Sequence, residues 1–332
     1  MPFDESEIPV YADVEEAAKQ IAGQAVRTPL LRNDQLDART GARVFVKPEA
    51  LQRTGSFKFR GAYNRISRLS ADQLKRGVMA YSSGNHAQGV AAAARLLGSH
   101  AKILMPADAP EVKVQGVRFW GGEVVSYDRY SENREEIGAR VAKEEGRTLV
   151  PPFENKYIIA GQGTAGLEAV EQMAEAGAVP DHVLCCAGGG GLIAGVGLAI
   201  KQHHPDAQIL AAEPVDFDDM KRTIETGIKV TNDQLAGSIC DAIITPTHGD
   251  LTWRVNSHQL AGGTAVSDDE VLAAMAFAWR HLKIVVEPGG AVALAAALTG
   301  KVDLAGKTAL VIISGGNVDR AMFERALERG ED

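Results

Sequence analysis

Four consecutive glycines, Gly188–Gly191, constrain the fold of this chain more than any other feature. They separate an apolar run, 183–187, from a second apolar run that is rich in alanine and glycine, 192–200. This order predicts a strand, a glycine loop and a helix. Glycines let a ligand approach the backbone closely, and the N-terminus of a helix favours an anion. The unit therefore predicts an α/β fold with a loop that can cradle a phosphate.

Short apolar segments alternate with segments of helical periodicity along the rest of the chain, which predicts parallel sheet. The expected strands are 42–47, 77–81, 101–105, 123–126, 148–150, 209–213 and 308–313. The expected helices are 13–21, 62–69, 87–97, 132–145, 165–174 and 268–281. The run 308–313 is apolar throughout, so we expect it near the centre of its sheet. Residues 228–266 show no clear periodicity and stay unassigned.

Three polar loops follow expected strands, namely Ser82–His86, Gly188–Gly191 and Ser314–Asn317. In open α/β sheets, ligands bind beyond the carboxyl ends of the strands. The sequence therefore predicts that these loops share one site.

Lys58 lies between Phe57 and Phe59 where an expected strand leads into an expected helix. Desolvation of a lysine lowers its pKa, and a neutral amine can form a Schiff base with an aldehyde. The alternative is a surface lysine whose stem lies over the two rings. An amine of this kind together with a phosphate loop indicates pyridoxal phosphate as a cofactor.

Composition narrows the function classes. The 332 residues carry a formal net charge of −8 without a basic block, which argues against nucleic acid or an anionic membrane as partner. No apolar run approaches the ~20 residues of a membrane-spanning helix, and the acidic N-terminus does not resemble a signal peptide. The three cysteines are an odd number, which favours reduced thiols in a cytoplasmic protein.

Five motifs, in this order, resemble the threonine/serine dehydratase and serine racemase family, which includes the 3-hydroxyaspartate ammonia-lyases. They are Ser56–Ala62, Ser82–His86, Ala160–Thr164 (expected to open the helix 165–174), Gly188–Leu192 and Ser314–Asn317. These are fold-type II pyridoxal-phosphate enzymes, similar to tryptophan synthase β. The resemblance implies two parallel-sheet α/β domains with the cofactor between them. Residues 1–76 and 155–332 would form the large domain, 77–154 a small domain that closes over substrate, and the enzyme would be a homodimer.

The resemblance also implies roles for single residues. Lys58 would carry the cofactor as a Schiff base, Phe57 would pack beside the pyridine ring and Asn85 would bind the ring hydroxyl. The phosphate would lie on Gly188, Gly189, Gly190, Gly191 and Leu192, and Ser314 would meet the pyridine nitrogen. The substrate carboxylate would be held by Ser82, Ser83, Gly84, Asn85 and His86, with Ser83 the second acid/base of racemases.

Two further sites follow from the resemblance. Arg134 would face the cleft and pair with a distal carboxylate of the substrate; the alternative is a solvated arginine on a charged helix. Glu213, Asp219 and the carbonyl of Phe217 would bind a divalent cation, Mg²⁺, Mn²⁺ or Ca²⁺, across a turn that Pro214 imposes. The alternative there is an acidic turn that caps the next helix.

The implied activity is that of an ammonia-lyase (dehydratase), which converts L-threonine or L-serine to a 2-oxo acid and ammonia. Lys58, once freed by the substrate amine, would take the Cα proton. Because a serine hydroxyl at position 314 cannot impose a full positive charge on the pyridine nitrogen, rapid loss of the β-hydroxyl is favoured. The alternatives within the family are dehydration of 3-hydroxyaspartate and serine racemisation with side dehydration.

Two readings lie outside this family. A nicotinamide dehydrogenase would use Gly189–Ala194 as its dinucleotide motif and Glu213 as its ribose-binding acid, which leaves Lys58 without a role. A binding protein that retains the fold without turnover is the second. The chain departs from relatives at Cys186-Ala187, where we expect only packing to change, at Ala242, and at Pro288–Gly290 beside Glu287.

Overall fold

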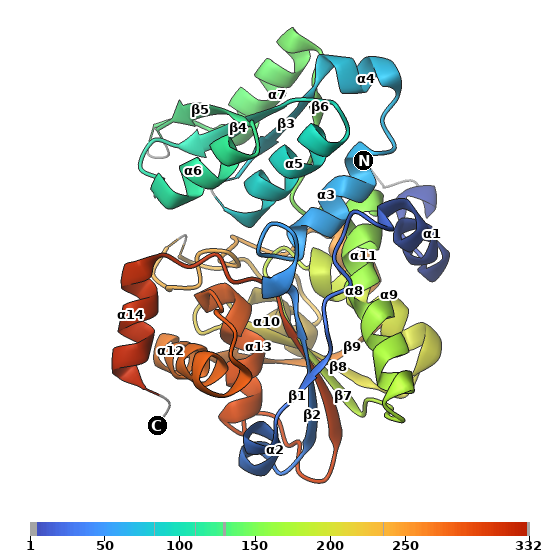
Figure 1. The fold of residues 1–332 in the computed structure, drawn as a ribbon, viewed down its shortest axis with the longest axis vertical. Coiled ribbons are helices and arrows are strands. Elements are labelled where there is room, and N and C mark those ends of the chain that lie inside the picture. The colour runs from blue at the N-terminus through green and yellow to red at the C-terminus, as the bar shows by residue number, and fades with distance from the viewer. Residues whose placement is uncertain (1–4, 83, 110, 129–130, 235, 331–332) are drawn as a thin grey trace.

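The chain folds around two β-sheets (Figure 1). A computed structural model describes residues 5–82, 84–109, 111–128, 131–234 and 236–330. The larger sheet has the strand order β1-β2-β10-β7-β8-β9. Its strands are β1 (Leu31–Arg32), β2 (Arg43–Pro48), β7 (His182–Cys186), β8 (Gln208–Pro214), β9 (Leu260–Val266) and β10 (Thr308–Ile313). All neighbours are parallel except β1 and β2. The expected central strand is β10, which lies between β2 and β7.

The smaller sheet is parallel throughout, with the order β5-β4-β3-β6. Its strands are β3 (Val78–Tyr81), β4 (Ala101–Pro106), β5 (Glu123–Tyr127) and β6 (Thr148–Leu149). The helices between them are α5 (Asn85–Leu96), α6 (Glu111–Phe119) and α7 (Arg134–Glu145). The alanine run of α5 is buried against this sheet, because small side chains let a helix lie close to a strand layer.

Most of the other helices surround the larger sheet, whereas α4 lies beside the smaller one; α3 packs against both α5 and α8, so it lies between the two sheets (Figure 1). They are α1 (Tyr11–Ile21), α2 (Asp34–Thr40), α3 (Lys58–Ile66), α4 (Ala71–Arg76), α8 (Lys156–Glu175), α9 (Gly191–His203), α10 (Asp219–Thr226), α11 (Asp250–Asn256), α12 (Asp268–Phe277), α13 (Pro288–Leu298) and α14 (Arg320–Arg329). Short 3-10 turns occupy Glu5–Glu7 and Glu49–Leu51, and a π-helical turn, Ala278–Leu282, extends α12.

Three expectations about elements differ from the structure. The motif Ala160–Thr164 does not open a helix but lies inside α8, which begins at Lys156 with Asn155 as its cap. Its glycines serve close helix contact, since a Cβ on Gly163 would lie 2.7 Å from the carbonyl oxygen of Gly195. The helix expected from 62 begins at Lys58, and the unassigned region 228–266 contains α11 and β9.

Candidate active site

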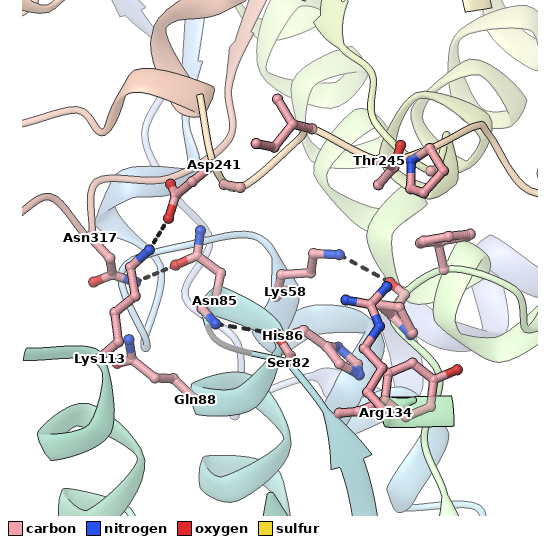
Figure 2. Close-up of a pocket in the computed structure, with 18 of the residues that line it drawn as sticks. Lys58, Ser82, Asn85, His86, Gln88, Lys113, Arg134, Asp241, Thr245 and Asn317 are labelled. Carbon is pink, nitrogen blue, oxygen red and sulfur yellow. Dashed lines mark hydrogen bonds and ion pairs between the residues drawn. The ribbon is translucent and has the colours of Figure 1, made fainter. Parts of the chain in front are cut away.

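A cavity of about 580 Å³ lies between the two sheets, at the carboxyl ends of their strands. Its lining includes Lys58 and Gly189 from the part of the chain around the larger sheet (the larger part). It also includes Asn85, His86 and Arg134 from the part around the smaller sheet (the smaller part; Figure 2). A second cavity, of about 40 Å³, shares part of this lining and reaches Phe57, the glycine loop and Ser314. The structure thus brings the three polar loops expected from the sequence to one place. Ser83 lies outside the described residues.

Lys58 is the first residue of α3, and its ammonium donates a hydrogen bond to the carbonyl of Pro152 at 3.0 Å. The nitrogen lies 5.2 Å from the centre of the Phe57 ring. Burial lowers the pKa of Lys58 to about 8, although Cys186 and Glu287 oppose the shift. A lysine in this state is a competent nucleophile near neutral pH, and its place in both cavities does not fit a surface residue.

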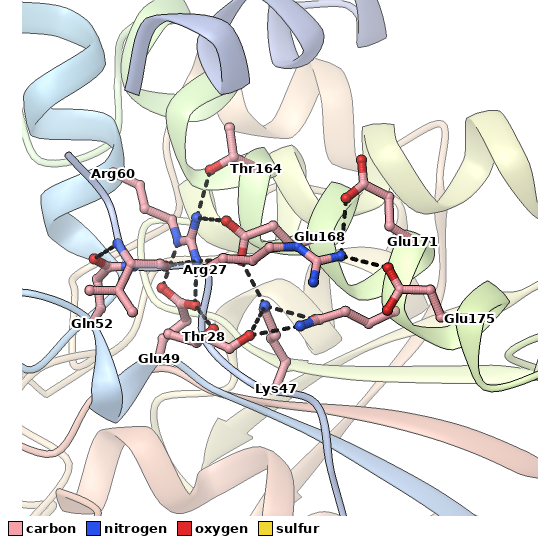
Figure 3. A network of polar contacts seen from close by, with 12 residues as sticks. Arg27, Thr28, Lys47, Glu49, Gln52, Arg60, Thr164, Glu168, Glu171 and Glu175 are labelled. Carbon is pink, nitrogen blue, oxygen red and sulfur yellow. Dashed lines mark hydrogen bonds and ion pairs between the residues drawn. The ribbon is translucent and has the colours of Figure 1, made fainter. Parts of the chain in front are cut away.

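A buried ionic network holds the far side of α3 (Figure 3). Arg60 is fully buried and binds the carboxylate of Glu49 through Nε at 2.7 Å and Nη2 at 2.8 Å. It also binds Glu168 on α8, at 2.7 and 2.9 Å, and Lys47 on β2 shares that carboxylate at 2.7 Å. Although burial opposes it, Arg60 holds the pKa of Glu49 below its usual value. The network therefore fixes the helix that begins at Lys58.

The glycine loop joins β7 to α9 in a conformation that requires glycine. Gly190 has φ of +86°, in the left-handed region. A Cβ on Gly189 would lie 2.3 Å from the ring of Phe153, and one on Gly188 would lie 2.6 Å from the carbonyl oxygen of Ile243. The loop therefore presents bare backbone, at the N-terminus of α9, to the smaller cavity. A phosphate fits this donor set.

Ser314 follows β10 directly and lies beside the lysine segment. Its carbonyl accepts a hydrogen bond from the Phe57 amide at 3.0 Å, so Phe57 and Ser314 both line the smaller cavity. Cys186 lines the same cavity, and a hydrogen bond with Cys185, with help from Ser314 and Lys58, lowers the pKa of its thiol. Cys186 therefore lines the smaller cavity, and the expectation that it changes packing alone stays a prediction.

Asn85 is held between two polar partners. Its amide donates to the Glu287 carboxylate at 2.5 Å and accepts from Asn317 at 2.7 Å. Burial raises the pKa of Glu287 to about 8; the bond from Asn85 opposes this shift and Asp241 adds to it. No role for Glu287 follows from the sequence alone. A glutamate before Pro288, at the start of α13, was the available signal.

His86 lines the larger cavity as a neutral acceptor. Burial lowers the pKa of its imidazole to about 3, and Nε2 donates to the carbonyl of Val150 at 2.9 Å. Its Nδ1 is buried and has no hydrogen-bond partner within the described part of the chain. This ring therefore cannot donate to a carboxylate, although backbone N–H groups at the start of α5, next to Gly84 and Ser82, can.

Charged side chains from both the larger and the smaller part line the larger cavity. Arg134, at the start of α7, lines it with its guanidinium 5.6 Å from the centre of the Tyr81 ring. Lys113 on α6 forms an ion pair with Asp241, which follows the cysteine at 240 (Figure 2). The smaller and larger parts are thus joined by an ion pair where the cavity opens between them.

The acidic segment 213–219 begins at the end of β8, the neighbour of β7, and is followed by Met220, whose side chain would lie 2.8 Å from a Cβ on Gly190. Pro214 does not turn the chain, because it continues β8 and pairs with Val266; the reversal occurs at Asp216, with φ of 69°. Glu213 accepts from the amides of Met220 and Lys221 at 3.1 and 2.8 Å.

Asp219 accepts from Asn232 at 2.8 Å and from His248 Nδ1 at 2.8 Å. Burial, and then Asp219, raise the pKa of Glu213 well above its usual value. No group of three or more histidine, cysteine, aspartate or glutamate side chains suited to a metal occurs among the described residues. Two buried carboxylates that repel each other nevertheless fit a cation.

Residues 21–315 match the family described as pyridoxal-phosphate dependent enzyme. The chain is 43% identical to an L-threo-3-hydroxyaspartate ammonia-lyase from Pseudomonas sp., covering 96% of this chain and 98% of that one. It is 38% identical to a serine racemase from Schizosaccharomyces pombe, covering 97% and 98%. Its structure resembles that of a threonine deaminase from T.th., with a TM-score of 0.89, 40% identity and coverage of 94% and 99%.

The chain therefore belongs to the pyridoxal-phosphate-dependent enzymes. The predicted fold class, two parallel-sheet α/β parts of fold type II, is confirmed. Pyridoxal phosphate as cofactor and the enzyme class, an ammonia-lyase of the dehydratase type, are confirmed as well. The dehydrogenase reading is excluded, because the glycine loop belongs to this family's fold. No helix within the described residues is long and apolar enough to cross a membrane.

Proposed function

We propose that the chain dehydrates a β-hydroxy amino acid with a second carboxylate, 3-hydroxyaspartate, to oxaloacetate and ammonia, with L-serine and L-threonine as further substrates. The observation that carries this proposal is Arg134 in the wall of the cavity that also contains Lys58. The Pseudomonas relative, which is named for this substrate, supports it. A substrate panel read by 2-oxo acid release tests it, and turnover of threonine in preference to hydroxyaspartate would refute it.

The cleft suits a substrate with two carboxylates. The N-terminus of α5 offers backbone N–H groups for the α-carboxylate, next to Asn85. Arg134 lies at the start of another helix, with its guanidinium over the Tyr81 ring. The N–H groups at the edge of the guanidinium can then bind a distal carboxylate bidentately.

We propose the following roles for the chain's own residues. The bound cofactor supplies an aldehyde and an electron sink. Lys58 binds that aldehyde and, when released, holds the proton taken from Cα. Phe57 packs beside the ring, Ser314 meets the ring nitrogen, Asn85 meets the ring hydroxyl, and Gly188–Leu192 hold the phosphate. These roles are supported by the lining of the two cavities. Residues 77–154 would act as the small domain that closes over substrate.

We also propose a divalent cation, Mg²⁺, Mn²⁺ or Ca²⁺, on Glu213, Asp219 and the carbonyl of Phe217. All three residues are buried, and burial together with Asp219 raises the pKa of Glu213 above its usual value. A hard cation would offset the repulsion between the two carboxyl groups. Because Met220, directly after this segment, reaches Gly190, the ion would brace the loop without touching substrate.

Racemisation of serine is the second candidate, and the S. pombe relative named for it supports it. It needs a second acid/base, the expected role of Ser83. Ser83→Ala should then suppress racemisation of L-serine, read by chiral analysis, more than dehydration of L-serine; equal loss of both would remove this role. We further propose a homodimer, which light scattering tests, and a cytoplasmic location, which the three buried free thiols support.

A further inference from the structure

The outer side of the glycine loop is bonded to a short helix, α11, that no site has been assigned to. The carbonyl of Gly189 accepts from the Thr252 hydroxyl at 2.7 Å and from the Gly249 amide at 3.2 Å. The carbonyl of Gly190 accepts from the Asn256 side chain at 3.2 Å. Among the described residues that line the two cavities, none comes from α11. These bonds therefore lie on the side of the loop away from the cavity.

Thr252 and Asn256 are spaced four residues apart, so they share one face of α11, and both are fully buried. A third residue fixes the amide of Asn256. Gln259 donates to Asn256 Oδ1 at 3.2 Å and to the carbonyl of Ala194, in the first turn of α9, at 3.0 Å. With its oxygen engaged in this way, Asn256 presents its Nδ2 to Gly190. We call Thr252, Asn256 and Gln259 the α11 brace.

The geometry of the peptide bond gives these contacts a consequence on the other side of the loop. A trans peptide is planar, and its C=O and N–H point in opposite directions. The carbonyl of Gly189 shares its plane with the N–H of Gly190, and the carbonyl of Gly190 shares its plane with the N–H of Gly191. Donors that hold the two carbonyls away from the cavity thereby turn the two N–H groups toward it.

We propose that Thr252 and Asn256 are positioning residues that aim the Gly190 and Gly191 N–H groups at the phosphate of the cofactor. This inference rests on the proposed function, in which the glycine loop holds that phosphate. Glycines at 189 and 190 are flexible, so a loop without the brace would lose entropy on binding an anion. The brace removes that cost in advance, which is preorganisation.

The test compares pyridoxal phosphate with pyridoxal, which lacks the phosphate, by titrating each onto the full-length chain after removal of the cofactor. Thr252→Val keeps the shape of the side chain and removes the hydroxyl. One neutral hydrogen bond is worth about 0.5–1.5 kcal/mol, so we expect about two- to thirteenfold weaker binding of pyridoxal phosphate. Binding of pyridoxal should be unchanged within about twofold. Asn256→Leu should have a smaller effect, because the Ala194 amide also holds the Gly190 carbonyl, at 3.0 Å. Thr252→Ser should restore the parent affinity.

Thr223→Val is the matched control, because Thr223 is a fully buried threonine on α10 whose hydroxyl bonds the Val230 amide. It should alter neither affinity. If Thr252→Val weakens the binding of both compounds equally, Thr252 has only a structural role. If it weakens the binding of neither compound, the proposed function of the brace is wrong. Gly190→Ala separates the two proposals. If Gly190→Ala weakens pyridoxal phosphate and Thr252→Val does not, the brace alone is wrong.

If instead the parent chain binds both compounds equally well, the loop does not hold the phosphate. The proposed role of the brace is then wrong as well. The melting temperature of the cofactor-free chain with inorganic phosphate provides a second measurement that does not depend on the cofactor ring. Phosphate should raise it in the parent and in Thr223→Val, and less in Thr252→Val. An equal rise in all three would overturn the brace.

Discussion

Asn85 and Glu287 come from opposite sides of the active-site cavity and meet through a hydrogen bond of 2.5 Å, with Asn85 as the donor. Asn85 begins α5 above the smaller sheet, and Glu287 precedes α13 beside the larger one. The carboxyl is buried, and this burial raises its pKa to about 8. A group that titrates near neutral pH thus links the two halves of the site.

This pair predicts how stability depends on pH. The pKa of Glu287 is higher in the folded chain than in the unfolded chain, so between about pH 4.5 and 8 the folded state keeps a proton that the unfolded state has lost. Stability should therefore fall as pH rises through this window, by up to ~1.4 kcal/mol per pH unit. Glu287→Gln carries no titrating proton, so its loss of stability over the same window should be smaller. Denaturant unfolding at pH 5, 6.5 and 8 measures the difference, and parallel curves for parent and variant would contradict it.

Lys58 should be the residue that carries the cofactor. Lys58→Ala should remain folded, lose the near-visible absorption band of the bound cofactor and lose all turnover. Borohydride should trap the cofactor on Lys58 in the parent, as mass spectrometry of peptides would show. Lys75→Ala, an exposed lysine on α4, is the control and should keep both band and activity. A Lys58 variant that still turns over substrate would rule the assignment out.

Arg134 should decide the preference for an acidic substrate. Arg134→Ala should raise KM for 3-hydroxyaspartate at least about tenfold, because a charge-assisted bidentate pair is worth about 1.5–3 kcal/mol, and should spare L-serine. Arg140→Ala is the matched control, since Arg140 is exposed on the same helix and does not line the cavity. Steady-state kinetics with both substrates measures the effect. An equal rise in KM for hydroxyaspartate and for serine would show that Arg134 does not bind the second carboxylate.

Removal of divalent cations should lower both activity and melting temperature, with Mg²⁺ or Mn²⁺ restoring both. Because a cation favours the ionised form of a carboxyl ligand, binding of Mg²⁺ should lower the raised pKa of Glu213. Glu213→Gln should abolish the response to added metal. A parent enzyme that is indifferent to EDTA would show that this segment is only the cap of α10.

The sequence allowed the layout of the site to be predicted, because each of its three loops follows a strand whose apolar pattern is clear. It did not allow α11 and β9 to be found. A helix of seven residues spans barely two turns, and β9 contains Gly262 and Gly263, which weaken the alternation typical of a strand. The contact of Glu287 with Asn85 also escaped prediction, since the two residues are far apart in the chain.

The network around Arg60 restricts how this sequence can diverge. Arg60 and Lys47 carry two positive charges, and Glu49 and Glu168 carry two negative charges, so the group is neutral only as a whole. Removal of one member of a buried pair costs about 3–5 kcal/mol, a large part of the ~5–15 kcal/mol that keeps a typical domain folded. Replacement of all members by apolar residues can cost nothing. Single substitutions in this network should therefore be selected against. Only a simultaneous replacement of several of its residues would give a homologue that folds without the network.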